Sequence, residues 1–142
     1  MEIPITFEGN KPERKTDGAA GYDLKSDETK TIQPNEFVVV STGTKIQMPR
    51  EYYGVLHNRS SNGMRQLVMT TGAGVIDSDY TGTIFCCFRN LSPVPIMITK
   101  GERIAQIVIM KWEKVNFIPV FSEGELQKTE RGDGGFGSTG KK

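Results

Sequence analysis

Residues 84–110 read Ile84-Phe-Cys-Cys-Phe-Arg-Asn-Leu-Ser-Pro-Val-Pro-Ile-Met-Ile-Thr-Lys-Gly-Glu-Arg-Ile-Ala-Gln-Ile-Val-Ile-Met110, and they indicate the structural class most directly. Three short apolar runs within them, 84–88, 94–98 and 103–110, are rich in β-branched and aromatic residues. Runs of about four to eight such residues are typical of β-strands. The turn signals Arg89-Asn90 and Lys100-Gly101 separate the runs. This stretch therefore predicts consecutive β-strands.

Similar runs occur on both sides of this stretch, at residues 37–40, 52–56, 67–69 and 115–120. Pro34-Asn35 is a further turn signal. No window sustains the 3.6-residue period of an amphipathic helix over three turns, so we expect at most one or two short helices. Many short, evenly spaced strands favour an all-β chain folded as a jelly-roll-like sandwich or barrel.

The segment Arg131-Gly-Asp-Gly-Gly-Phe-Gly-Ser-Thr-Gly140 predicts a separate C-terminal arm, because half of its residues are glycine. Glycine loses the most backbone entropy on ordering, so the segment does not favour a regular element. Phe136 is suited to stack on a base, and Arg131 is suited to bind phosphate. The alternative is an ordinary disordered tail. We expect a domain over residues 1–121 and a flexible arm over 122–142.

Composition limits the classes of partner and compartment. The 142 residues suit one domain, and the hydrophobic share of 36% suits a modest core, which favours oligomerisation. Eighteen basic residues against seventeen acidic ones leave no strong field for nucleic acid or anionic membranes. The adjacent Cys86 and Cys87 with the single His57 favour neither a disulfide framework nor a zinc site. We expect a reducing, cytoplasmic setting without nucleic-acid or membrane partners.

Four other segments carry polar groups that a plain strand domain does not need. Ala20-Gly-Tyr-Asp23-Leu is a turn with one carboxylate, which an Asx-turn would also explain. Asn58-Arg-Ser-Ser-Asn-Gly63 offers a guanidinium and two hydroxyls, so it suits either a phosphate cradle or a polar hairpin turn.

The remaining two segments lie further along the chain. Between Gly72 and Gly82, glycines allow close approach of a ligand, and Asp77 and Asp79 share a face if the stretch is extended. Gln106 stands inside an apolar strand, where its amide needs either a protein partner or a ligand.

Together these segments resemble the trimeric dUTP diphosphatase (dUTPase) family in order and spacing. The matching residues are Ala20-Gly-Tyr-Asp-Leu24, Arg59-Ser-Ser61, Gly74-Val-Ile-Asp-Ser-Asp-Tyr80, Arg103-Ile-Ala-Gln106 and Arg131-Gly-Asp-Gly-Gly-Phe-Gly-Ser-Thr-Gly140. Residues 41–49 resemble the family's strand before its second motif. The resemblance implies a jelly-roll homotrimer with three active sites, each built from three chains. It also implies hydrolysis of dUTP to dUMP and diphosphate, which limits uracil in DNA and supplies dUMP for dTTP synthesis.

The resemblance also implies roles for single residues. Asp77 would be the general base for water attack at the α-phosphate, and Asp23 would hold Mg²⁺ through water. The backbone near Thr71 would read uracil, and Tyr80 would pack beneath the deoxyribose. The implied substrate-binding set is Arg59, Ser60, Ser61, Thr71, Gly74, Val75, Ile76, Tyr80, Gln106, Arg131, Phe136, Gly137, Ser138 and Thr139.

Two alternatives remain open at this point. The second motif, Arg59-Ser-Ser-Asn-Gly63, also resembles the dCTP deaminases of the same fold, although Cys87 stands where those enzymes carry their glutamate base. A thiol does not shuttle protons as that carboxylate does. The other alternative is a dUTPase-like trimer of viral or phage type that also binds and regulates another protein. Such a trimer would act in an infected cell. If the chain is eukaryotic, a nuclear location is also open.

Overall fold

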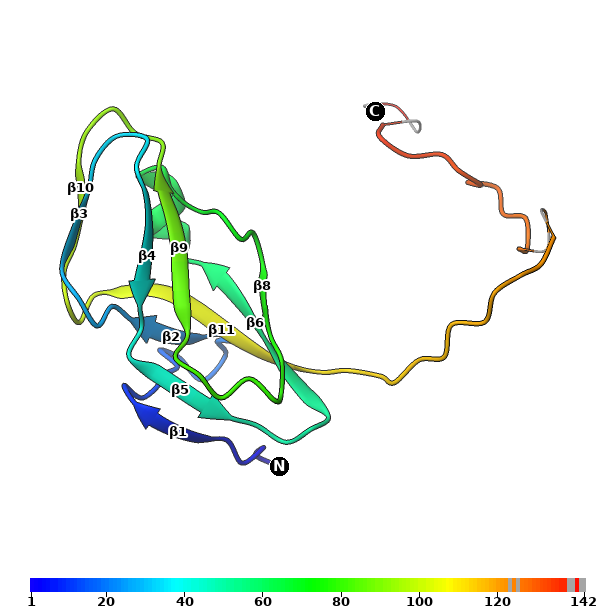
Figure 1. Cartoon of the computed structure of the whole chain (residues 1–142), viewed down its shortest axis with the longest axis horizontal. Helices are drawn as coiled ribbons and strands as arrows, with labels where there is room; N and C mark the ends of the chain where they lie inside the picture. Colours follow the sequence, from blue (N-terminus) through cyan, green and yellow to red (C-terminus); the bar gives the residue numbers. More distant parts are fainter. Residues whose placement is uncertain (123, 125, 138–139, 141–142) are drawn as a thin grey trace.

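A computed structural model of the chain describes residues 1–122, 124, 126–137 and 140. Within these residues the regular structure consists of eleven β-strands and one five-residue helix (Figure 1). The strands are β1 (Thr6–Gly9), β2 (Tyr22–Lys25), β3 (Lys30–Ile32), β4 (Phe37–Ser41), β5 (Thr44–Gln47), β6 (Tyr52–Asn58), β7 (Leu67–Met69), β8 (Gly74–Ile76), β9 (Phe85–Asn90), β10 (Ile96–Ile98) and β11 (Arg103–Lys111), and the helix is α1 (Ser60–Met64). The predicted all-β class is confirmed.

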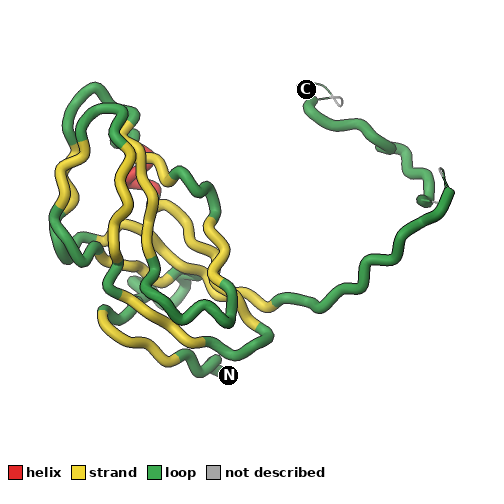
Figure 2. The backbone as a smooth tube through the Cα atoms, in the orientation of Figure 1, coloured by secondary structure: helices red, strands yellow, loops and turns green. Residues whose placement is uncertain are grey.

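Two larger sheets enclose the core, with strand orders β2-β11-β6-β8 and β4-β9-β7, and the pairs β1-β5 and β3-β10 complete the β-sandwich (Figure 2). All of the pairings are antiparallel. Inward residues of both larger sheets, such as Leu56, Ile107, Val40 and Phe88, belong to one buried cluster. Full burial of an apolar side chain of this size contributes about 1.5–3 kcal/mol, so this cluster is the main source of stability.

Strand β9 shows why the apolar runs form strands. Cys86, Phe88 and Asn90 are buried, whereas the alternate residues point outward, as the two-residue period of a strand requires. Burial raises the pKa of the Cys86 thiol to about 12, and the adjacent Cys87 adds to the rise, so Cys86 stays a neutral packing residue.

Most predicted strands are confirmed, and their counterparts are β4, β6, β7, β9, β10 and β11. The strand expected within residues 41–49 is β5. The turns at Pro34-Asn35 and Lys100-Gly101 are also confirmed, since Asn35 and Gly101 have φ of 65° and 88°. The prediction of a turn at Arg89-Asn90 is wrong, because both residues complete β9 and the buried Asn90 amide donates to the carbonyls of Ile32 and Val94.

The strand predicted at residues 115–120 is wrong for a single chain. The last strand ends at Lys111, and residues 112–120 are exposed and irregular. The described part of the arm leads away from the sandwich (Figure 1). A domain boundary at residue 122 and a flexible arm remain predictions.

No helix in the described part of the chain has the length and apolar character needed to cross a membrane.

Candidate active site

The outer face of the sheet β2-β11-β6-β8 carries the first group of predicted site residues. Asp23 on β2 stands opposite Gln106 on β11, and Gln106 stands opposite His57 on β6. These three side chains belong to the face that points away from the core, because Leu24, Leu56 and Ile107 beside them are buried. The sequence pattern drew attention to His57 only as a lone histidine that argues against a zinc site, and it did not reveal the place of His57 in this row.

The Asp23 carboxylate lies between two guanidinium groups. Its Oδ1 is 3.8 Å from Arg59 Nε, and its Oδ2 is 3.8 Å from Arg103 Nε. The side chain of Asp23 is only 15% exposed. Arg59 is fixed further because its Nη1 donates to the Arg103 carbonyl over 3.0 Å. The structure therefore brings together the predicted metal carboxylate and a predicted phosphate ligand.

Arg59 is positioned by the start of helix α1. Its backbone N–H donates to Asn58 Oδ1 over 2.9 Å, and the buried Asn62 amide donates to the same oxygen and to the Ile104 carbonyl. Asn62 therefore fixes α1 to both β6 and β11. Ser60 and Ser61 open the helix and are exposed. The polar hairpin turn considered for this segment is wrong, and no sequence pattern singles out Asn62.

Gln106 is half-buried, and its Nε2 donates to the Asn58 carbonyl over 3.4 Å. The amide thus has a protein partner, although the contact is at the long limit of a hydrogen bond. Its side chain lies against Gly21, where a Cβ atom would overlap Gln106 Oε1. Glycine at position 21 therefore gives Gln106 the room to lie beside Asp23.

The second group of site residues lies at the other edge of the same sheet. Strands β7 and β8 flank a turn that contains the exposed Thr71, and Gly74 and Val75 follow in β8. Gly74 packs against Leu56, because a Cβ added there would stand 3.4 Å from Leu56 Cβ. Val75 is 62% exposed, whereas Ile76 is half-buried. This edge therefore presents both backbone and side chains to solvent.

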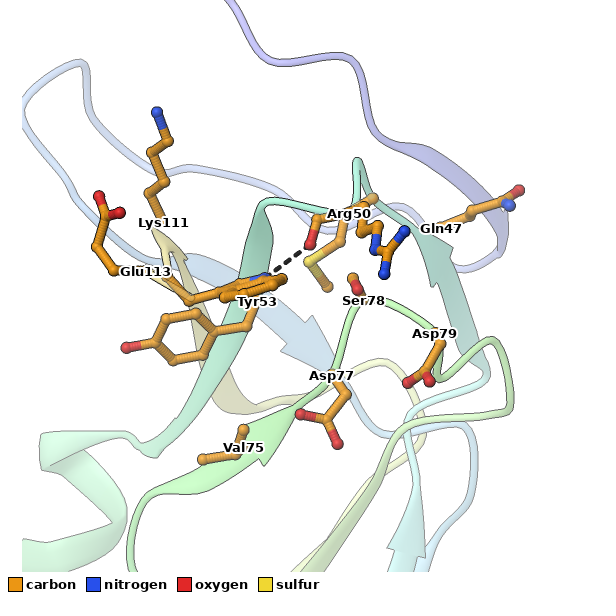
Figure 3. A pocket seen from close by; sticks show the side chains of 11 residues that line it. Gln47, Arg50, Tyr53, Val75, Asp77, Ser78, Asp79, Lys111 and Glu113 are labelled. Atoms are coloured by element: carbon orange, nitrogen blue, oxygen red, sulfur yellow. Dashed lines mark hydrogen bonds between the residues drawn. The ribbon is translucent and has the colours of Figure 1, made fainter. Parts of the chain in front are cut away.

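Asp77 and Asp79 lie on a turn rather than on an extended strand, so the condition under which strand alternation would place both on one face is not met. The Tyr80 N–H donates to the Asp77 carbonyl over 3.1 Å and closes the turn. Both carboxylates nevertheless line one pocket (Figure 3). Tyr80 is held separately, because its hydroxyl donates to the Thr83 carbonyl over 2.6 Å.

The pocket beside Asp77 is open to solvent and has a volume of about 1170 Å³. Its wall opposite Asp77 includes Tyr53 and Arg50, and the Trp112 indole N–H closes that wall by donating to the Arg50 carbonyl over 2.6 Å (Figure 3). The lining residues are Gln47, Met48, Arg50, Tyr53, Val75, Asp77, Ser78, Asp79, Lys111, Trp112 and Glu113.

The two groups of site residues do not share this pocket. Asp23 and Asp77 stand three strands apart, and by register Asp77 lies about four residues further along the sheet. With strands about 4.8 Å apart and about 3.3 Å per residue, the separation is on the order of 19 Å. One chain therefore does not bring both carboxylates to a single phosphorus atom.

The predicted arm residues lie outside both groups. Arg131 is exposed and its Nε donates to the Gly134 carbonyl over 2.7 Å. Phe136 and Gly137 are exposed, and Phe136 has a positive φ of 49°. Ser138 and Thr139 lie outside the described residues. Within one chain, the described arm contributes no lining residue to the pocket of Asp77.

A family model described as dUTPase matches residues 8–140 of this chain. The chain belongs to the dUTPase family. The deoxyuridine 5'-triphosphate nucleotidohydrolase of Corynebacterium glutamicum is 46% identical over 142 residues and covers 99% of this chain and 89% of that protein. The protein of the same name from Corynebacterium diphtheriae is 44% identical over 141 residues, with 98% and 87% covered.

Solved dUTPase structures agree with this assignment. A Staphylococcus bacteriophage 80alpha dUTPase mutant with dUpNHpp is 28% identical, with a TM-score of 0.85 over 96% of this chain and 98% of that chain. The Streptococcus mutans dUTPase is 34% identical, with a TM-score of 0.73 over 78% and 98%. The family and the jelly-roll fold are thus confirmed. Deamination is not favoured, and Cys87 lies on β9 of the other sheet, outside the pocket of Asp77.

Proposed function

We propose that this chain hydrolyses dUTP to dUMP and diphosphate by attack of water on the α-phosphate. The family match over residues 8–140, at up to 46% identity to named dUTP nucleotidohydrolases, carries the proposal. The two groups of polar residues on the outer sheet face supply the chemistry that this reaction needs. Removal of dUTP would limit uracil in DNA and provide dUMP for dTTP synthesis.

The group around Asp23 suits a metal-bound triphosphate. Mg²⁺ keeps several waters and takes few protein carboxylates when phosphates supply other ligands. The residues fit this mode, because Asp23 is a single carboxylate and no cluster of three or more metal-ligating side chains occurs among the described residues. Asp23 would hold the ion through water, while Arg59, Ser60, Ser61 and Gln106 bind the phosphates. The ion would supply charge neutralisation at the phosphate chain.

Asp77 suits the role of general base. Its side chain is exposed and lines the large pocket, and among the described residues no hydrogen-bond donor occupies its carboxylate. A free carboxylate is able to orient a water molecule and accept its proton. Neighbouring Thr71, Gly74, Val75 and Ile76 would read uracil through the backbone. Asp79 would stabilise the turn.

The active site would be shared between subunits of a homotrimer. Asp77 and Asp23 are too far apart in one chain to act on one α-phosphate, so a neighbouring chain must supply one of them. The outer sheet face that separates them is apolar and partly exposed, with Val75 and Met110 the most exposed of its members. Residues 115–121 carry further exposed apolar side chains. A neighbouring subunit would bury both surfaces.

The arm would close over nucleotide bound at such a shared site. Phe136 is fully exposed in one chain, which leaves its ring available for stacking on a base. Arg131, Gly137, Ser138 and Thr139 would contact the phosphates.

Cytoplasmic localisation remains a prediction, and the named Corynebacterium relatives are bacterial proteins.

Substrate selectivity tests the proposed function. We expect hydrolysis of dUTP to exceed that of dTTP and UTP by at least about 10²-fold, because a backbone-lined pocket excludes the thymine methyl group and Tyr80 blocks a 2′-hydroxyl. Release of diphosphate from dUTP, dTTP, dCTP and UTP, with and without Mg²⁺, is the measurement. Comparable rates on dUTP and dTTP would contradict the proposal, and ammonia release from dCTP would assign the chain to deamination.

Gly82 provides a specific test of Tyr80. A Cβ atom at position 82 would stand 2.9 Å from the Tyr80 hydroxyl oxygen and 3.0 Å from its Cζ. Since Tyr80 is 40% exposed, its ring has room to move while the backbone stays in place. We therefore expect Gly82→Ala to lower the preference for dUTP over UTP by about tenfold at nearly unchanged melting temperature. Gly63→Ala is the matched control, because nothing lies within 4 Å of a Cβ there.

A further inference from the structure

Arg103 faces the outer side of the sheet because of a β-bulge. In the pairing of β11 with β2, Arg103 stands opposite Lys25 and Ala105 stands opposite Leu24, so the register shifts between them. Ile104 and Ala105 are consequently both buried. In a regular strand Arg103 and Gln106 would point to opposite faces, since they are three residues apart. The bulge turns both toward Asp23.

Two guanidinium groups flank the Asp23 carboxylate. A carboxylate that is only 15% exposed loses much of its hydration and needs nearby cations. Each of its oxygens faces one arginine at 3.8 Å. At that distance neither contact is a hydrogen bond, so the oxygen lone pairs stay available for water. The two arginines thus balance the charge of Asp23 without occupying its hydrogen-bonding sites.

Arg59 and Arg103 differ in their expected roles when the nucleotide binds. Arg59 is the predicted phosphate ligand, and one hydrogen bond, to the Arg103 carbonyl, holds it in the substrate-free chain. If Arg59 turned toward phosphate, Asp23 would keep only one of its two flanking arginines. Glu102 does not compete for Arg103, because its carboxylate pairs with Arg65 over 3.1 Å. Arg103 would then be the arginine that remains beside Asp23, next to the hydrated Mg²⁺ of the proposed site.

We propose that Arg103 is a positioning residue that holds the Asp23 carboxylate in place while Arg59 binds phosphate. This inference rests on the proposed function, since it takes Asp23 to be the metal carboxylate. Arg103 acts through Asp23 rather than on the nucleotide, so its effect must vanish when Asp23 is neutral. That dependence separates it from a direct phosphate ligand.

A double-mutant cycle measures the dependence. Binding of a non-hydrolysable dUTP analogue with Mg²⁺ is measured by calorimetry for the wild type, Arg103→Gln, Asp23→Asn and the double variant. We expect Arg103→Gln to weaken binding about tenfold in the wild-type background and less than about twofold in the Asp23→Asn background. Arg103→Lys, which keeps the charge, should recover part of the loss and serves as the second variant if Arg103→Gln folds poorly.

Lys25→Gln is the matched control. Lys25 stands opposite Arg103 in the pairing of β11 with β2, but its ammonium group pairs with Glu13 over 3.6 Å. Loss of the Lys25 charge should therefore leave binding of the dUTP analogue unchanged. Equal losses from Arg103→Gln in both backgrounds would overturn the inference and make Arg103 a direct ligand. Unchanged binding in Arg103→Gln would overturn it as well. A wild-type chain that does not bind the analogue would overturn the proposed function and this inference together.

Discussion

Asp77→Asn is expected to lower the turnover of dUTP by roughly 10² or more while a non-hydrolysable dUTP analogue still binds. Asparagine keeps the size and hydrogen-bonding capacity of the side chain but removes the basic carboxylate. The turn should persist, because the Asp77 carbonyl rather than its side chain accepts from the Tyr80 N–H. Steady-state turnover together with calorimetric binding is the measurement.

Asp79→Asn is the matched control for this change. Asp79 lines the same pocket two residues away, so it tests whether any loss of negative charge there impairs turnover. We expect the Asp79 variant to retain most activity. If Asp79→Asn is the inactive variant and Asp77→Asn the mild one, the general base is Asp79. Parallel loss of binding in Asp77→Asn would point to a structural role.

Ending the chain after residue 130 is expected to remove most activity without unfolding the sandwich. The truncation deletes Arg131 and Phe136 but, among the described residues, no strand, since β11 ends at Lys111. Stacking of an aromatic ring on a base is worth about 1–3 kcal/mol, so the loss of Phe136 alone should weaken nucleotide binding markedly. Activity, melting temperature and particle mass are the measurements.

Mixing this truncated chain with Asp77→Asn chains tests the shared site. If a site takes Asp77 and the arm from different chains, a mixed trimer contains sites with both elements intact, although neither parent does. Co-refolding should therefore restore a fraction of wild-type turnover. Mixed trimers that are confirmed by mass but remain inactive would show that Asp77 and the arm act within one subunit.

The sequence predicted strands well where apolar residues dominate and poorly where they do not. Strands β1, β2 and β3 are only three or four residues long. Charged or polar residues stand at alternate positions in β1 and β2 and at two adjacent positions in β3, so no apolar run marks these strands. Residues 115–120 have a strand composition, but the part of their own chain that the structure describes offers them no partner strand. Strand formation requires such a partner, and composition does not supply it.

The candidate site was predictable by residue type but not by geometry, and the roles of its residues remain predictions. The carboxylates, hydroxyls and Arg59 were evident from their motifs. The pairing of Asp23 with Arg103 was not, because it depends on a β-bulge that breaks the two-residue period on which strand prediction rests. Asn62 was missed for a similar reason, since only the packing of α1 against β6 and β11 shows that its amide is buried and bonded.

The distance between Asp23 and Asp77 on one sheet face has a consequence for mass action. If complete sites need three chains, their number at high dilution falls with the cube of the free-chain concentration rather than in proportion to it. The rate per milligram of protein would then depend on how far a stock is diluted. Nucleotide that bridges subunits would lower the chain concentration at which complete sites form. The concentration of the chain in a cell would therefore set both the number of complete active sites and the fraction of chains that contribute to one.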